Sequence, residues 1–95
     1  MRKYEVMYII RPSLEPEKIK EVVAYFNEVL TTNNANVLEL KEWGLRDLAY
    51  EIEKHRKGYY VWLKIEADVN AVNELNRLIR INESIIRYII VKEGE

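Results

Sequence analysis

Hydrophobic and polar residues follow two different periods along this chain. Residues 3–10, KYEVMYII, alternate at first and then become fully apolar, which is typical of a strand in the middle of a sheet. Residues 36–52 alternate over a longer stretch, residues 59–66 return after a basic turn, KHRKG, and residues 85–92, IIRYIIVK, form a last apolar run. The period of two therefore predicts four strands.

Two other segments have apolar residues at intervals of three and four, which indicates amphipathic helices. The first follows Arg11-Pro12, and we expect Ser13 to cap it and Pro16 to lie in its first turn. We expect Asp68 to cap the second helix, which ends at Asn82. The predicted inward residues are Ile19, Val22, Val23, Phe26, Val29 and Leu30 in the first helix, and Val72, Leu75, Leu78 and Ile79 in the second.

The elements follow one another in the order β-α-β-β-α-β, which is the plan of the ferredoxin-like split βαβ fold. This α+β fold has a four-stranded antiparallel sheet with both helices on one face. A chain of 95 residues is enough for one hydrophobic core, so we expect residues 1–95 to form a single domain. The second face of the sheet has no helix to cover it.

The alternation in the long second strand changes phase part-way. Leu38 and Leu40 share one parity, Trp43 and Leu45 have the other, and Leu48, Tyr50 and Ile52 return to the first. One extra residue in the strand accounts for such a switch, so we predict a β-bulge at or near Gly44.

Charged positions decide which side chains lie on the open face. Lys64 and Glu66 cannot lie beneath helices, so Tyr60 and Trp62 share the open face with them, and Tyr59, Val61, Leu63 and Ile65 point inward. The same reasoning sends Tyr4, Val6, Tyr8 and Ile10 inward. The open face then carries Met7, Ile9, Tyr60, Trp62, Ile89 and Val91. A charged rim around an apolar patch is typical of an interaction surface, although single exposed apolar residues are also ordinary.

Composition narrows the class of protein. The chain has 48% hydrophobic and 33% charged residues, which is typical of a globular protein and not of a disordered one. It has no cysteine, and no apolar run is long enough to span a bilayer or to act as a signal peptide, so we expect a cytoplasmic protein. The net charge of −1 argues against an indiscriminate nucleic-acid coater, but the cations are gathered locally.

The sequence lacks the residue sets of an enzyme or a metal site, and we expect neither catalysis nor a cofactor. The only histidine, His55, lies in the basic turn without a cysteine partner, and Ser13 and Ser84 lie where caps and turns are expected. The acidic pairs Glu15/Glu17 and Glu51/Glu53 are expected to be solvated. An alternative is a small-ligand regulatory or acylphosphatase-like domain that uses Arg11 as an anion site, although its loop, RPSLEP, has no glycine to cradle a phosphate.

Three segments carry a resemblance to a known family. The run WGLRDLAYEIEKHRKGYY at residues 43–60 closely resembles the signature of bacterial ribosomal protein S6, a protein of the small subunit. The segments MRKYEVMYIIRP and IRINESIIRYIIVK resemble the flanking motifs of that family. The likeness covers nearly all of the chain, in order and with similar spacing.

The resemblance implies a structural protein of the small ribosomal subunit, located in the ribosome. Members of the family bind the central domain of the small-subunit ribosomal RNA together with the small basic ribosomal protein S18, with which they form a heterodimer. A nearly neutral domain is a poor RNA ligand alone, because affinity for RNA comes mainly from neutralised phosphates. We expect a monomer when the protein is free, and no membrane partner.

Site residues follow from the resemblance and from charge. The resemblance implies RNA contacts for Arg2, Tyr4, Arg87 and Lys92, although Tyr4 has inward parity and could reach RNA only at the end of its strand. The cations Lys54 and Arg56 of the basic turn are further candidates for phosphates. Asp47 departs from the basic or amide residue of many relatives, and an acidic side chain would repel phosphate. The predicted partner-protein interface is Lys41, Glu42, Arg46, Tyr60 and Trp62, whose aromatic members could instead stack on bases.

Overall fold

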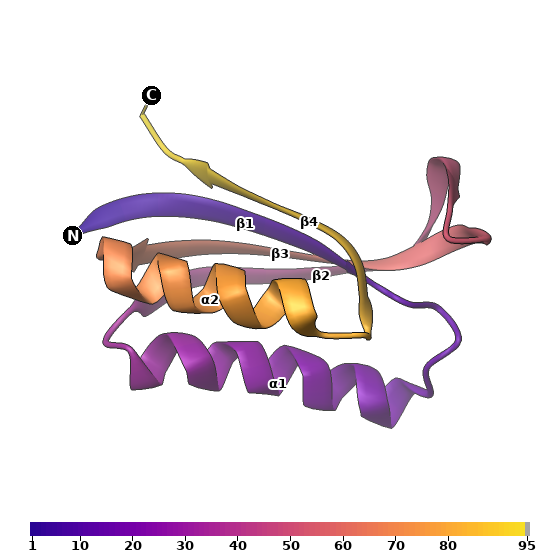
Figure 1. Cartoon of the computed structure of the whole chain (residues 1–95), viewed down its shortest axis with the longest axis horizontal. Helices are drawn as coiled ribbons and strands as arrows, with labels where there is room; N and C mark the ends of the chain where they lie inside the picture. Colours follow the sequence, from indigo (N-terminus) through magenta and orange to yellow (C-terminus); the bar gives the residue numbers. More distant parts are fainter. Residues whose placement is uncertain (95) are drawn as a thin grey trace.

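The structure is a computed structural model that describes residues 1–94, and its elements follow the predicted order (Figure 1). Glu95, the last residue of the predicted domain, lies outside the described residues. The elements are strand β1 (Arg2–Ile10), helix α1 (Pro16–Thr32), strand β2 (Asn36–Ile52), strand β3 (His55–Ala67), helix α2 (Val69–Ile81) and strand β4 (Ile85–Lys92).

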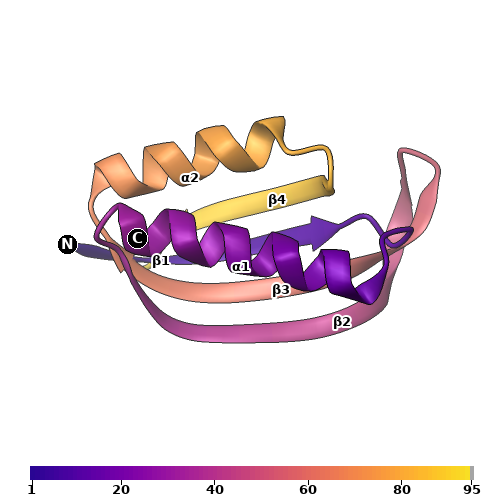
Figure 2. The ribbon, with the colours of Figure 1, turned by 90° about the horizontal axis from the view of Figure 1, so that it is seen from below.

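The four strands form one antiparallel sheet in the order β2-β3-β1-β4. The first strand of the chain is therefore central, and β2 and β4 are the two edges. Both helices lie on the same face of this sheet, as the views in Figures 1 and 2 show. This arrangement confirms the ferredoxin-like split βαβ fold.

The core lies between the helices and the inward side of the sheet, and the predicted parity is confirmed there. Tyr8 packs edge-on against Phe26 of α1, with ring centroids 5.2 Å apart. The half-buried Val22, Val72 and Leu78 pack around this centre. The fully or almost fully buried residues of the core include Val6, Tyr8, Ile10, Val61, Leu63 and Ile65 from the sheet and Phe26, Leu30, Leu75 and Ile79 from the helices.

One of the two predicted helix caps is wrong. The residue at the start of α1 is Glu15, whose side chain makes no capping bond, and Ser13 lies outside the helix. Pro16 explains the difference, because a residue before proline is pushed into extended backbone, and Glu15 has φ −66° and ψ 152°. The second cap is confirmed, since the backbone N–H of Ala71 donates to Asp68 Oδ1 at 3.1 Å.

The basic turn is shorter than the predicted KHRKG. The chain reverses at Glu53 and Lys54, which have φ of 47° and 69°, and β3 begins at His55. A two-residue turn with positive φ at both positions matches the twist of the flanking strands, so the pairing continues up to Ile52 and His55. Lys54 is thus a turn residue, as predicted, but Arg56 lies in a strand.

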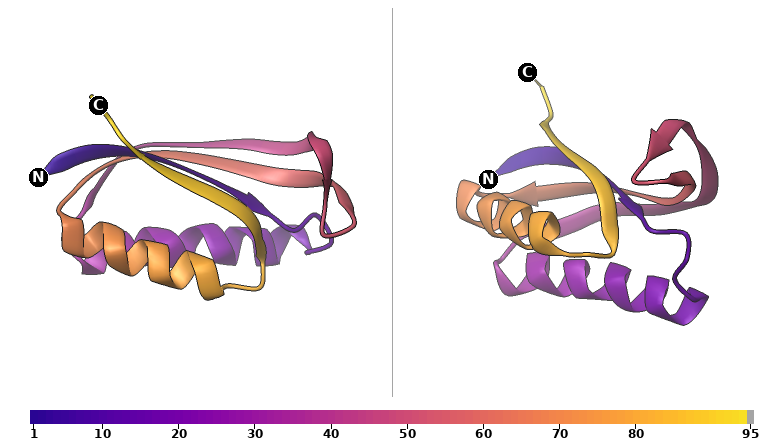
Figure 3. Two further views of the ribbon diagram at one scale, coloured as in Figure 1. Left: turned by 45° about the horizontal axis from the view of Figure 1, so that its top comes forward. Right: turned by 45° about the vertical axis from the view of Figure 1, so that its right-hand side comes forward.

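The far end of the β2–β3 hairpin curls away from the helices, toward the open face of the sheet (Figures 1 and 3). This curl corrects the prediction for Ile9. Its side chain lies on the open face but is only 7% exposed, because it packs closely against Gly58, next to Leu48 and Ile86, which also lie near the Gly58 position. The rest of the predicted patch is accessible: Met7, Tyr60 and Trp62 are half-buried, and Ile89 and Val91 are exposed by 55% and 45%.

Candidate functional site

A bulge in β2 places a second tryptophan on the open face. The register passes from Glu42 opposite Val61 to Gly44 opposite Tyr60, so Trp43 is the extra residue, and Gly44 has φ +81°. This confirms the predicted bulge. The Trp43 ring stacks on Tyr60 with centroids 6.4 Å apart and an interplanar angle of 17°.

Two cations lie close to aromatic rings of the open face. Lys41 Nζ is 5.4 Å from the centroid of the Trp62 ring, two residues along β3 from Tyr60. The guanidinium carbon of Arg46 is 5.8 Å from the Trp43 ring, and Arg46 Nε donates to the carbonyl oxygen of Trp43 at 3.3 Å. These residues lie on the open face of β2 and β3, and we name them the cation–aromatic row: Lys41, Trp62, Tyr60, Trp43 and Arg46.

Glu42, the fifth predicted interface residue, lies apart from this row. Its Oε1 accepts a hydrogen bond at 2.9 Å from the hydroxyl of Tyr59, which has inward parity. Burial, followed by this bond to Glu42, raises the pKa of Tyr59 above its usual value. Four of the five predicted residues are therefore on the open face, and Glu42 is on the helix side.

The predicted RNA-contact residues fall into two groups. The first group, Arg2, Tyr4 and Lys92, lies at the end of the sheet where β1 begins, and Tyr4 pairs with Lys92 across the strands. Arg2 is exposed, whereas Tyr4 is half-buried against the core, as its parity predicts. By the alternation along their strands, all three side chains are on the face of the sheet that the helices cover.

The second group, Lys54, Arg56 and Arg87, lies at the other end of the sheet. Lys54 and Arg56 are exposed in the curled hairpin. Arg87 pairs with Ile9 on the open face, and its Nη1 donates to the hydroxyl of Tyr50 at 2.8 Å. Residues 2 and 9 of a strand are about 23 Å apart at a rise of roughly 3.3 Å per residue. The two groups are thus separate basic regions.

Arg11, the anion site of the alternative hypothesis, is partly engaged within the protein, while its buried Nε has no hydrogen-bond partner among the described residues. Arg11 donates through Nη2 to the carbonyl oxygen of Glu83, and its backbone N–H donates to the carbonyl of Ser84 at 2.8 Å. Residues 1–94 contain no cluster of three or more His, Asp or Glu that could hold a metal ion. Within the same residues, no helix is long and apolar enough to cross a membrane.

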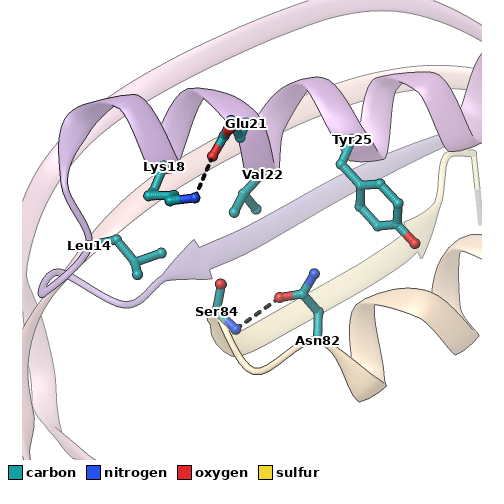
Figure 4. Close-up of a pocket in the computed structure, with 7 residues that line it drawn as sticks. All are labelled: Leu14, Lys18, Glu21, Val22, Tyr25, Asn82 and Ser84. Atoms are coloured by element: carbon teal, nitrogen blue, oxygen red, sulfur yellow. Dashed lines mark hydrogen bonds and ion pairs between the residues drawn. The ribbon is translucent and has the colours of Figure 1, made fainter.

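A shallow groove of about 290 Å³ separates α1 from the loop between α2 and β4 (Figure 4). Leu14, Val22 and Tyr25 form most of its apolar lining. Two pairings engage polar groups of this lining: Lys18 pairs with Glu21 at 3.3 Å, and the Ser84 N–H donates to Asn82 Oδ1 at 2.8 Å.

Comparison with known proteins assigns this chain to a family. A family model described as Ribosomal protein S6 matches residues 3–92. The chain belongs to the ribosomal protein S6 family. Membership in this family of small-subunit proteins implies a structural role in the ribosome, not catalysis.

Relatives and solved structures agree with the S6 assignment. The small ribosomal subunit protein bS6 of Acholeplasma laidlawii is 60% identical over 95 residues, which is 100% of each chain. The crystal structure of 30S ribosomal protein S6 from Thermotoga maritima has a TM-score of 0.93 at 27% identity, covering 97% of this chain and 87% of the other. An Arabidopsis thaliana protein with a TM-score of 0.58 and 14% identity, covering 100% and 95%, shares the fold alone.

Sequence reasoning missed two residues of the surface. Trp43 was not placed on the open face, although the change of phase near Gly44 carries that information. Tyr50 was also missed, because its contact with Arg87 joins residues 37 positions apart and depends on the curl of the hairpin. Only the first of these had a signal in the sequence.

Proposed function

We propose that this chain is a structural constituent of the bacterial small ribosomal subunit that binds the central domain of the ribosomal RNA as a heterodimer with ribosomal protein S18. The observation that carries this proposal is the cation–aromatic row on the open face of a domain whose net charge is −1. Such a surface suits a protein partner, and a basic partner supplies the positive charge that RNA binding requires.

The row is proposed as the partner-protein surface for a physical reason. Tryptophan, tyrosine and arginine are the residues most enriched at the centres of protein interfaces. The apolar Ile89 and Val91 extend the same face toward β4. Lys41, Glu42 and Arg46 lie on the edge strand β2, where charges also discourage edge-to-edge association of copies of the free protein. We therefore propose a free monomer.

The two basic groups are proposed as RNA contacts, with Arg2 and Lys92 at one end and Lys54 and Arg56 at the other. Arginine can hold a phosphate through two donors, which lysine cannot. Tyr4 is half-buried and contributes chiefly to the core at the end of β1. Asp47 pairs with Lys57 at 3.9 Å, so its carboxylate is close to a cation of the same hairpin.

A titration tests this proposal. A ribosomal RNA fragment of the central domain is titrated with this protein alone, with S18 alone and with the equimolar pair, at two salt concentrations. We expect tight binding from the pair only, with an affinity that falls steeply with salt as neutralised phosphates recapture their counterions. Equal affinity with and without S18 would contradict the heterodimer, and absence of binding in all arms would contradict RNA binding.

A catalytic assay separates the alternative. An acylphosphatase-like domain would hydrolyse an acyl phosphate such as benzoyl phosphate, and Arg11→Ala would abolish that activity. We expect no hydrolysis above background, since the guanidinium of Arg11 is bonded to the Glu83 carbonyl. Hydrolysis that depends on Arg11 would support the alternative.

A further inference from the structure

The contact between Arg87 and Tyr50 joins the two outer strands of the sheet. Arg87 lies on β4 and Tyr50 on β2, and β3 and β1 lie between these strands. Nη1 of Arg87 donates to the Tyr50 hydroxyl at 2.8 Å, and the guanidinium carbon is 5.6 Å from the centroid of the Tyr50 ring. The curl of the hairpin over the open face makes this contact possible (Figures 1 and 3).

The end of the hairpin has few other attachments. Regular pairing between β2 and β3 is interrupted after Asp47 and resumes only where Ile52 meets His55. Beneath the curl, Ile9 is buried against Gly58, and side-chain atoms of Leu48 and Ile86 also lie close to the Gly58 position. This apolar packing and the contact between Arg87 and Tyr50 thus both attach the end of the hairpin to the rest of the sheet.

We propose that Arg87 is a positioning residue, which holds residues 48–57 over the open face through Tyr50 and in this way fixes the direction of the basic turn. The Nη1 donor of Arg87 is directed at the Tyr50 hydroxyl, and the guanidinium carbon lies near the Tyr50 ring. The cations Lys54 and Arg56 move with this segment. The consequence for RNA rests on the function proposed above, whereas the attachment itself is a property of the free protein.

Amide hydrogen exchange in the free protein tests the attachment. Tyr50→Phe keeps the ring and removes only the hydroxyl that accepts from Arg87. We expect exchange of the amides of residues 48–57 to rise about threefold or more, with little change in β1, because local opening depends on local contacts. Tyr25→Phe, on an exposed ring of α1, is the matched control and should leave the hairpin unchanged. Unchanged exchange in Tyr50→Phe would overturn the proposal.

RNA titration with S18 tests the consequence. A positioning role predicts that Tyr50→Phe and Arg87→Gln each weaken binding about threefold to tenfold, that the double variant is no weaker than the worse single one, and that the salt dependence is unchanged. A phosphate ligand predicts instead that Arg87→Gln reduces the salt slope by about one while Tyr50→Phe binds normally. That second pattern would overturn the proposal. If the wild-type pair binds no RNA, the proposed function fails, and the exchange experiment still decides the attachment.

Discussion

Gly58 shows how one missing side chain allows the open face to pack. A Cβ placed there would overlap Cγ2 of Ile9 and would lie 3.5 Å from Leu48 and 3.6 Å from Ile86. Ile9 can be buried on a face without helices only because β3 has no side chain at this point. The residue is thus needed for close approach, not for an unusual backbone angle.

The Gly58→Ala variant should therefore be less stable. We expect a loss of about 1–3 kcal/mol in the free energy of unfolding, the usual cost of overpacking, measured by urea denaturation. Ile9→Ala removes the atom that the new methyl would strike, so in a double-mutant cycle the loss from Gly58→Ala should be smaller in the Ile9→Ala background. If the losses from Gly58→Ala and Ile9→Ala simply add in the double variant, the clash between the new methyl group and Ile9 is not the cause of the destabilisation.

Tyr8 brings a polar hydroxyl group into the hydrophobic core. Its ring is fully buried in the core, and its hydroxyl has no hydrogen-bond partner among the described residues. Tyr8→Phe should keep the fold and raise the free energy of unfolding by up to about 1 kcal/mol, because a buried hydroxyl without a partner costs desolvation energy. Tyr88→Phe is the matched control: its hydroxyl donates to Asn76 Oδ1 at 2.6 Å, so that variant should lose stability. A large loss in Tyr8→Phe would contradict this account.

Two tyrosines also predict how stability changes at alkaline pH. Burial, with a smaller effect of Glu42, raises the pKa of Tyr8, and burial raises the pKa of Tyr59. Above about pH 10 the unfolded chain loses these protons while the folded protein keeps them, so the free energy of unfolding falls as pH rises. Tyr8→Phe should flatten this fall, measured by urea denaturation between about pH 8 and about pH 11. An identical slope in the variant would be contrary to the expectation.

At the scale of elements, the bulge in β2 organises the cation–aromatic row. Gly44, at φ +81°, adopts a backbone conformation that side chains with a Cβ rarely take, and no atom crowds the space beside it. Its position lets Trp43 stack on Tyr60 and lets Arg46 reach the Trp43 ring. The surface therefore depends on one irregular residue.

Substitution at Gly44 should disturb stability and the row together. Gly44→Val should cost about 1–3 kcal/mol through backbone strain and should weaken the near-ultraviolet circular dichroism of the stacked Trp43 and Tyr60. Gly44→Asn is the control, because asparagine tolerates left-handed backbone and should cost less. Equal effects of valine and asparagine would show that strain at this position is not the cause.

Most of the element pattern could be predicted from the sequence because its signals are local. Lys64 and Glu66 fixed the parity of β3, and the phase change located the bulge. The two errors have different causes. The cap prediction at Ser13 failed for a local reason, because Pro16 makes Glu15 the residue at the start of α1. Ile9 is buried by contacts between residues far apart in the sequence, which no alternation encodes. In the surface itself, the contacts of Lys41 with Trp62 and of Arg87 with Tyr50 could not be predicted, because they join strands whose register only the folded sheet sets.

At the scale of the whole molecule, the charges of the open face matter more for partners than for folding. Arg46 is exposed, and its side chain donates to the carbonyl oxygen of Trp43 and lies by the Trp43 ring. Arg46→Glu should therefore change the free energy of unfolding by about 0.5 kcal/mol or less. It should weaken association with S18 by about tenfold, because it removes an arginine, and the cation on the Trp43 ring, from the centre of the proposed interface.

The measurement for Arg46→Glu is calorimetric titration with S18, beside a thermal melt of the free protein. Lys18→Glu is the matched control, since it makes the same charge change on α1, on the opposite face of the sheet from the row. Unaltered S18 affinity in Arg46→Glu would remove this residue from the interface. A large drop in melting temperature would instead identify it as a structural residue.

The central place of β1 has a consequence for the order in which the protein can be made and folded. Both hydrogen-bonding edges of β1 are filled by strands that come much later, β3 from His55 and β4 from Ile85. During translation the amino-terminal strand emerges first and must wait for them, while the two helices and the β2–β3 hairpin can form from neighbouring sequence. A nascent chain that ends before Ile85 leaves one edge of its central strand open, so completion of the sheet coincides with the final stage of synthesis.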